Sequence, residues 1–209
     1  MKFYVRTTGE RSLSNYNFDY EIMVDKDHNP IQSFINQMRL ISNDNAIMLE
    51  DDLEFSKDFL IEIEQAISRY SDKVINFFYL YLQFMPTQII KGKAFLNNQC
   101  VYYPKGVAKK IADEMQKLID DGLQNNQYDQ IQAKAMDNLN IDFISYRPML
   151  VQHIGGTNSM MGNIWINQGK TIFFKDDLPC NYDNFKEILK YAHKKYDELG
   201  IKYPKIVIK

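Results

Sequence analysis

AIMLEDDLEFSKDF, residues 46–59, is the stretch from which the rest of the chain can be interpreted. Its apolar run, Ala46 to Leu49, is short and is bounded by polar residues, which is typical of a buried strand in an α/β sheet. Three carboxylates, Glu50, Asp51 and Asp52, fall at the carboxyl end of that strand. Ligands of open α/β sheets bind outside this end of the strands. We therefore expect a hard-cation or phosphate–metal site here, because adjacent carboxylates repel one another unless a cation lies among them.

The same stretch has a purely structural interpretation. The residues from Leu53 to Tyr70 carry apolar side chains at helical spacing, so we expect a helix there. Ser56 would then cap its N-terminus and Asp58 would lie in its first turn, which makes the acidic triplet a solvated turn before a helix. The buried strand that precedes the triplet favours the metal site over this alternative.

The composition indicates one soluble folded domain without a strong overall charge. The chain has 209 residues, of which 45% are hydrophobic, and a net charge of -2. This length is enough for a core, and this balance gives no overall attraction to nucleic acids or membranes. No stretch approaches the length of a transmembrane helix, and the first residues lack the apolar region of a signal peptide, so we expect a protein that is neither secreted nor membrane-spanning. Cys100 and Cys180 are far apart and lack metal-binding spacing, which indicates reduced thiols in a cytoplasmic protein.

Strand and helix patterns alternate along most of the chain. This order predicts an α/β fold with a mostly parallel sheet flanked by helices and a short C-terminal helical extension. We expect a main domain over residues 1–175 and a C-terminal helix with a basic tail over 176–209. The expected strands are 2–6, 21–25, 46–49, 74–84, 99–103 and 141–146, and the expected helices are 31–41, 53–70, 107–119, 129–135 and 182–199.

Further candidate side chains follow the first two strands. Arg6 and Arg11 flank the hydroxyls of Thr7 and Thr8 and a glycine, a combination suited to a diphosphate or a ribose. Arginines on an exposed loop are as often plain solvated charges. Asp25 ends the second strand, where a carboxylate can meet a ligand at the same edge of the sheet.

An imidazole, His153, and a carboxylate at the start of a helix, Asp129, complete the candidates. The structural alternatives are a hydrogen-bonded core histidine and a helix N-cap. The sequence lacks the motifs of α/β-hydrolases, P-loop NTPases, dinucleotide oxidoreductases and thiol-redox proteins. The remaining classes use a divalent metal, held by one or two carboxylates plus substrate phosphates, and an imidazole suits Mn²⁺ better than Mg²⁺.

Two segments resemble those of a known enzyme class. The segment Ile47-Met-Leu-Glu-Asp-Asp52 resembles the DxD-type motif of nucleotide-sugar-dependent GT-A glycosyltransferases, in the Glu-Asp-Asp form of family 25 and related transferases. Residues 147–159, RPMLVQHIGGTNS, resemble the Pro-Ser-Leu-(Val/Phe)-Gln-His-(Ile/Val)-Gly-x-x-Ser segment of these enzymes and of N-acetylglucosaminyltransferase IV-like proteins, with Met149 where Ser is common. The resemblance extends over roughly residues 2–160. It implies a GT-A, Rossmann-like fold and transfer of a sugar from a nucleoside diphosphate sugar to an acceptor hydroxyl.

The resemblance also implies roles for the candidate residues. Asp52 would coordinate Mn²⁺, or Mg²⁺, bound to the donor diphosphate, and His153 would complete the metal's ligands. Asp51 or Glu50 would meet the ribose or orient those ligands. Asp25 would contact the nucleoside.

In inverting members of this class an acidic residue that opens a late helix is the general base, and Asp129 occupies that place. The chain is short for the class, which leaves two alternatives open: a catalytically silent GT-A-like protein that binds a nucleotide or glycan, and a metal-dependent nucleotidyltransferase. A glycan or protein acceptor is favoured over a modified DNA base, because the chain has no strongly basic character.

Overall fold

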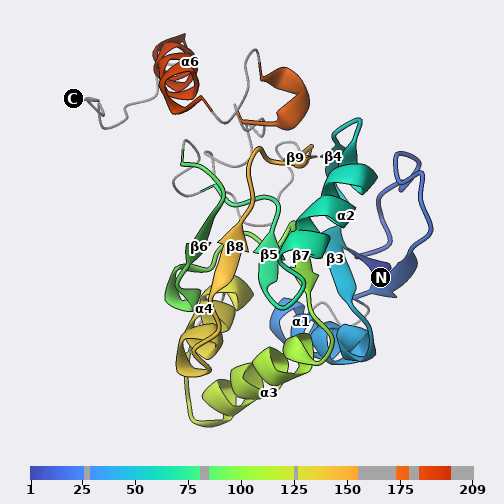
Figure 1. The fold of residues 1–209 in the computed structure, drawn as a ribbon. Helices are drawn as coiled ribbons and strands as arrows, with labels where there is room; N and C mark the ends of the chain where they lie inside the picture. The colour runs from blue at the N-terminus through green and yellow to red at the C-terminus, as the bar shows by residue number, and fades with distance from the viewer. Residues whose placement is uncertain (26–28, 81–84, 125–126, 155–172, 179–183, 199–209) are drawn as a thin grey trace.

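The protein is an α/β fold built on one central sheet with helices on both faces (Figure 1). A computed structural model describes residues 1–25, 29–80, 85–124, 127–154, 173–178 and 184–198. The central sheet has seven strands in the order β2-β1-β3-β7-β5-β8-β6, and β4 and β9 form a second, two-stranded sheet. The strands are β1 Lys2–Thr7, β2 Glu21–Val24, β3 Ala46–Glu50, β4 Leu53–Phe55, β5 Val74–Asn76, β6 Gln88–Ile90, β7 Cys100–Tyr103, β8 Phe143–Ser145 and β9 Val151–His153.

Helices occupy the connections. The α-helices are α1 Pro30–Leu40, α2 Phe59–Arg69, α3 Val107–Asp120, α4 Tyr128–Asn138 and α6 Phe185–Glu198, and the 3-10 helices are η1 Ile41–Asn43, η2 Gly92–Ala94 and η3 Lys175–Asp177. Asn29 caps α1 by accepting a hydrogen bond from the Gln32 amide at 3.2 Å, and Pro30 follows at the first helical position. The helices expected over 31–41, 107–119, 129–135 and 182–199 are confirmed, with ends that differ by a few residues.

The central sheet is mixed, but most of its strands point the same way. β1 pairs in parallel with β2 and β3, and β5 pairs in parallel with β8. β7 runs antiparallel to β3 and β5, and β6 runs antiparallel to β8. A parallel connection needs a long crossover, usually a helix. α1 supplies such a crossover between β2 and β3, whereas β6 and β7 are the two strands of this sheet that run in the reversed direction.

Both faces of the sheet are covered, which explains the continuous apolar strands. Successive residues of a strand point to opposite faces, so Met48 of β3 faces α1, α3 and α4, whereas Ile47 and Leu49 face α2. Figure 1 shows these helices on their respective sides of the sheet. Several candidate residues lie at the carboxyl ends of β1, β2 and β3.

The expected helix over 53–70 begins later than predicted. Leu53–Phe55 is strand β4 instead, because it pairs with β9, and α2 starts only at Phe59. The proposed Ser56 cap is therefore wrong: Asp58 occupies the N-cap position and makes no side-chain capping bond. A partner nearly a hundred residues away decides this local structure.

The expected strand over 74–84 is shorter than predicted. β5 ends at Asn76, whose amide donates to the carbonyls of Leu96 and Asn97 at 2.9 and 2.8 Å. Its side-chain oxygen also accepts a bond from the Phe78 amide at 2.9 Å. These bonds divert the backbone from the sheet, while Phe77, Phe78 and Tyr79 remain buried, as expected.

The C-terminal helix packs on the segment before it. Ile188 and Ala192 of α6 contact the buried Phe173, whose carbonyl accepts a hydrogen bond from the Met149 amide at 3.1 Å. Cys180 and the basic tail from 202 lie outside the described residues, as does the stretch 155–159 of the second motif. Within the described part of the chain, no helix combines the length and apolar character needed to cross a membrane.

Candidate metal centre

Two strands bring the acidic triplet and the imidazole to one place. β3 ends at Glu50, and the chain then turns into β4, which pairs antiparallel with β9 so that Leu53 lies opposite His153. The Ile154 amide donates to the Asp52 carbonyl at 2.8 Å and closes this pairing. As a result, ligand atoms of Glu50, Asp52 and His153 all lie within 4.8 Å of one another.

Asp52 is the central residue of this cluster. Its Oδ2 lies 3.0 Å from Nε2 of His153 and accepts a bond from Nη1 of Arg11 at 2.6 Å. Burial opposes the charge of Asp52, but His153 and Arg11 outweigh it and lower its pKa. Burial likewise opposes the charge of His153, and Asp52 outweighs it and raises the histidine pKa.

Two ligand-type atoms in the cluster have no hydrogen-bond partner. Oδ1 of Asp52 and Nδ1 of His153 are buried, and neither meets a donor or acceptor in the part of the chain that the structure describes. Buried polar atoms are normally satisfied, so such atoms at a candidate site need an explanation. A bound cation is an explanation that fits both atoms, because carboxylate oxygens and imidazole nitrogens are both metal ligands.

Asp51 points away from the cluster, toward the loop after β1. Its Oδ2 accepts a bond from the Thr7 hydroxyl at 2.5 Å, and its Oδ1 accepts one from Arg11 at 2.8 Å. Arg11 therefore bridges Asp51 and Asp52, while Thr8 is exposed beside Thr7. The sequence predicts that Arg11 contacts a diphosphate or a ribose. In the structure it contacts two carboxylates of the acidic triplet instead.

Glu50 is held from the opposite side by aromatic and cationic groups. Oε1 of Glu50 accepts a hydrogen bond from the Tyr128 hydroxyl at 2.9 Å and lies 3.8 Å from Nη1 of Arg6. Burial raises the pKa of Glu50, and Arg6 opposes this effect. The Arg6 guanidinium lies 4.7 Å from the Phe34 ring centroid and 4.9 Å from that of Tyr128, and its Nε donates to Gln37 at 2.8 Å.

These contacts place Arg6 below the site rather than on an exposed loop. A guanidinium between two aromatic faces is stabilised by cation–π attraction. The structure thus assigns Arg6 a contact with Glu50, and it shows no contact that would single out a diphosphate. No sequence signal pointed to Tyr128, whose hydroxyl reaches a carboxylate 78 positions earlier.

Asp129 lies in the first turn of α4, directly after Tyr128. Gln127 occupies the N-cap position, so the structural alternative of an N-cap role for Asp129 is wrong. Its Oδ1 accepts a bond from the Gln130 amide at 2.9 Å, and burial raises its pKa. Because Tyr128 contacts Glu50, the start of α4 lies beside the candidate metal ligands, which keeps Asp129 as a candidate base.

Asp25 follows β2, next to the loop after β1. Its backbone amide donates to the Thr7 carbonyl at 2.9 Å. Its Oδ1 is buried and has no hydrogen-bond partner among the described residues. The structure therefore places Asp25 one strand away from the cluster, on the side where Thr7 and Asp51 meet.

Comparison with known proteins identifies no family for this chain. The chain matches no model of a protein family and no curated protein. The function must therefore be argued from the residues of the site.

Proposed function

We propose that this protein is a metal-dependent glycosyltransferase that moves a sugar from a nucleoside diphosphate sugar to an acceptor hydroxyl. One observation carries the proposal: Glu50, Asp52 and His153 converge within 4.8 Å at the carboxyl ends of β3 and β9. Two carboxylates and one imidazole suit Mn²⁺, and Mg²⁺ less well. The unpartnered Oδ1 of Asp52 and Nδ1 of His153 support a cation at this position.

The residues around the cluster have distinct tasks in this proposal. Asp52 and His153 hold the cation, and Glu50 is the third ligand. Tyr128 orients Glu50 through its 2.9 Å hydrogen bond. A metal held by these residues would neutralise charge on the departing nucleoside diphosphate. Arg11 brings a positive charge to the same edge of the site.

Asp129 is the proposed general base of an inverting transfer. It takes the proton of the acceptor hydroxyl as that oxygen attacks the anomeric carbon of the donor. A carboxylate with a raised pKa is a better proton acceptor than an ordinary one, provided that it remains ionised at the working pH. Burial gives Asp129 a shift in this direction. We favour a glycan or protein acceptor because the chain carries only a small net charge of -2.

A donor-hydrolysis assay tests this function directly. The protein is incubated with UDP-, GDP- and CMP-sugars, with Mn²⁺, with Mg²⁺ and with EDTA, and release of the sugar is measured. Hydrolysis of one donor that requires the metal and is lost in Asp52→Asn supports the proposal. Binding of a donor without turnover indicates a silent binding protein instead. Release of pyrophosphate from a nucleoside triphosphate and a sugar phosphate indicates a nucleotidyltransferase.

A further inference from the structure

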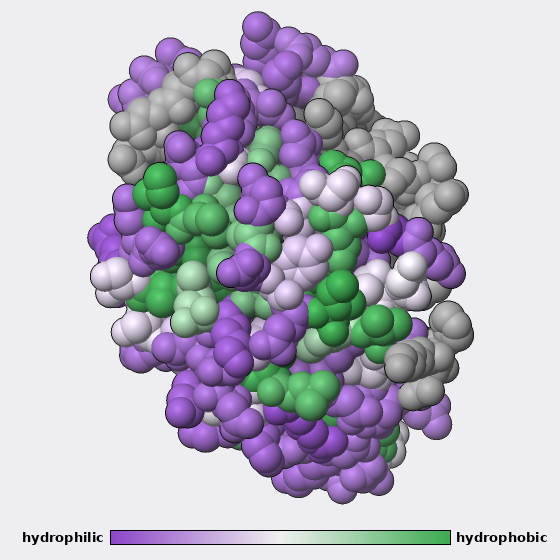
Figure 2. Space-filling model, turned by 90° about the vertical axis from the view of Figure 1, so that its right-hand side faces the viewer, coloured by the Kyte–Doolittle hydropathy of each residue, from purple (hydrophilic) through white to green (hydrophobic). Residues whose placement is uncertain are grey.

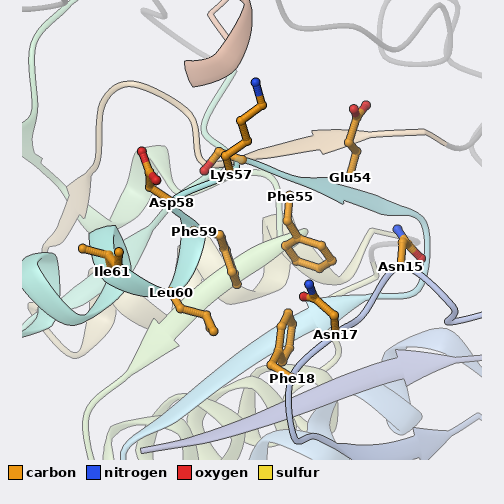
Figure 3. A pocket seen from close by; sticks show the side chains of 11 residues that line it. Asn15, Asn17, Phe18, Glu54, Phe55, Lys57, Asp58, Phe59, Leu60 and Ile61 are labelled. Atoms are coloured by element: carbon orange, nitrogen blue, oxygen red, sulfur yellow. The ribbon is translucent and has the colours of Figure 1, made fainter.

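A pocket lies next to β4, the strand that follows Asp52. It is lined by the loop after β1 and by the segment from Glu54 to Ile61, and its volume is about 440 Å³. Sites for small molecules commonly have volumes of about 300–1,000 Å³. Figure 3 shows the side chains of Phe18, Phe55 and Phe59 pointing toward one another in the middle of the pocket, with polar side chains around them. The pocket therefore shares the loop after β1, which carries Arg11, with the candidate metal site.

The floor of the pocket is aromatic. The ring centroids of Phe55 and Phe59 are 4.6 Å apart, and that of Phe18 lies 5.3 Å from Phe55 and 5.7 Å from Phe59. Phe18 and Phe55 are half-buried, so part of each ring is accessible to a ligand. The face of an aromatic ring carries partial negative charge, and it therefore attracts groups with a positive edge, such as the C–H face of a sugar ring.

The rim of the pocket is polar and carries both donors and acceptors. Asn17 and Glu54 are exposed, and their side chains have no hydrogen-bond partner among the described residues. Lys57 adds an ammonium group, whereas the Asp58 carboxylate already accepts a bond from Lys175 at 3.1 Å. Charges of both signs on the rim disfavour an anionic ligand and suit a neutral ligand with several hydroxyl groups.

The walls of the pocket are fixed before any ligand arrives. The Asn15 amide donates to the Leu53 carbonyl, and the Tyr16 hydroxyl donates to the Glu50 carbonyl, so the loop after β1 is attached to the β3–β4 segment. On the other side, Phe55 is paired with Val151 of β9. A preformed site loses less conformational entropy on binding.

We propose that this pocket binds a sugar ring of the glycan acceptor. That the bound sugar is the acceptor rests on the proposed function. The affinity of the pocket for carbohydrate does not depend on that function. Phe55 follows Asp52 by three residues, a separation of about 10 Å along an extended strand. A short oligosaccharide spans this distance, so a ring in the pocket leaves a neighbouring ring at the metal cluster. Figure 2 shows hydrophobic residues gathered over the middle of this side of the molecule, with hydrophilic residues around them.

Binding of carbohydrates to the full chain tests the inference. Maltose, lactose and N,N′-diacetylchitobiose are titrated by saturation-transfer NMR in EDTA and without nucleotide, so that neither metal nor donor is required. We expect at least one of them to bind, and we expect Glu54→Gln and Leu60→Ala each to weaken binding on the order of 5-fold, the effect of losing one contact. Leu60 is 40% exposed, so its replacement leaves the core intact.

Matched substitutions outside the pocket serve as controls. Glu64→Gln lies farther along α2, and Leu40→Ala removes a leucine that is 70% exposed at the end of α1. Neither should alter carbohydrate affinity. The inference is overturned if none of the three sugars binds, or if the pocket variants and the controls behave alike. Sugar binding without donor hydrolysis would refute the transferase proposal but not the sugar-binding pocket. Donor hydrolysis without sugar binding would refute the pocket but not the transferase proposal.

Discussion

Oδ2 of Asp52 lies 3.0 Å from Nε2 of His153, although 101 positions (153 minus 52) separate the two residues. β4 and β9 produce this contact, because their pairing sets Leu53 opposite His153. If the two side chains share one cation, Asp52→Asn and His153→Gln should each weaken Mn²⁺ binding by a factor on the order of 100. Titration of free Mn²⁺ by electron paramagnetic resonance measures this loss, with circular dichroism to verify that the variants fold.

Asp51→Asn is the matched control for that experiment. Asp51 is adjacent in sequence but accepts its bonds from Thr7 and Arg11, outside the group of three ligand atoms. Its Mn²⁺ affinity should stay within a few-fold of the wild type. Equal losses in all three variants would mean that the effect is one of overall charge and not of coordination.

A metal bound by Asp52 would compete with Arg11, which already pairs with that carboxylate. Nη1 of Arg11 lies 2.8 Å from Asp51 and 2.6 Å from Asp52, so a cation that binds Asp52 must work against this existing positive charge. We expect Arg11→Gln to raise Mn²⁺ affinity several-fold, since like charges at such distances repel by about 1 kcal/mol or more. Isothermal titration calorimetry measures the change. Arg39→Gln, which removes an arginine paired with Asp113, provides the control and should leave metal affinity unaltered.

The contact between Asp52 and His153 makes stability depend on pH. In the folded protein the pKa of Asp52 is lowered from 3.8 and that of His153 is raised from 6.5. The stabilisation is therefore complete between these two values. It declines at higher pH as pH rises through the raised histidine pKa, and at lower pH as pH falls through the lowered aspartate pKa.

This dependence can be measured in EDTA by comparing melting temperatures of the wild type and His153→Gln. The difference should be greatest at about pH 4 to 6.5 and should shrink as the pH is raised further, through the raised pKa of His153. A difference that stays constant over this range would show that the substitution acts through packing alone.

The variant Asp129→Asn distinguishes two roles of Asp129, that of a general base and that of a purely structural residue. Asparagine keeps the size and hydrogen-bonding shape of the side chain at the start of α4 but cannot accept a proton. Donor binding and melting temperature should therefore stay nearly unchanged, whereas transfer should slow by a factor on the order of 100 or more. Asp137→Asn, at an exposed position of the same helix, is the control. Full transfer activity in Asp129→Asn, or a product that retains the anomeric configuration, would remove Asp129 from this role.

Local patterns predicted the elements that carry their own signals. The apolar run of β3, the Asn29-Pro30 start of α1 and the Gly106 that precedes α3 are all readable from the chain. Gly106 has a φ of +80°, a conformation that glycine adopts readily. The elements that were predicted wrongly are those whose structure depends on distant partners. β4 needs β9, and the end of β5 depends on bonds from Asn76 to the segment at 96–97.

The sequence by itself determined the carboxylates after β3 and the alternation of strands and helices, because both follow from residue types within a few positions. Only the tertiary structure decided which side chains meet. Arg6 lies below Glu50, Arg11 bridges Asp51 and Asp52, and Tyr128 reaches Glu50 from another helix. Such meetings depend on strand order and register, which are set by the packing of two hydrophobic layers and by backbone pairing across the whole sheet.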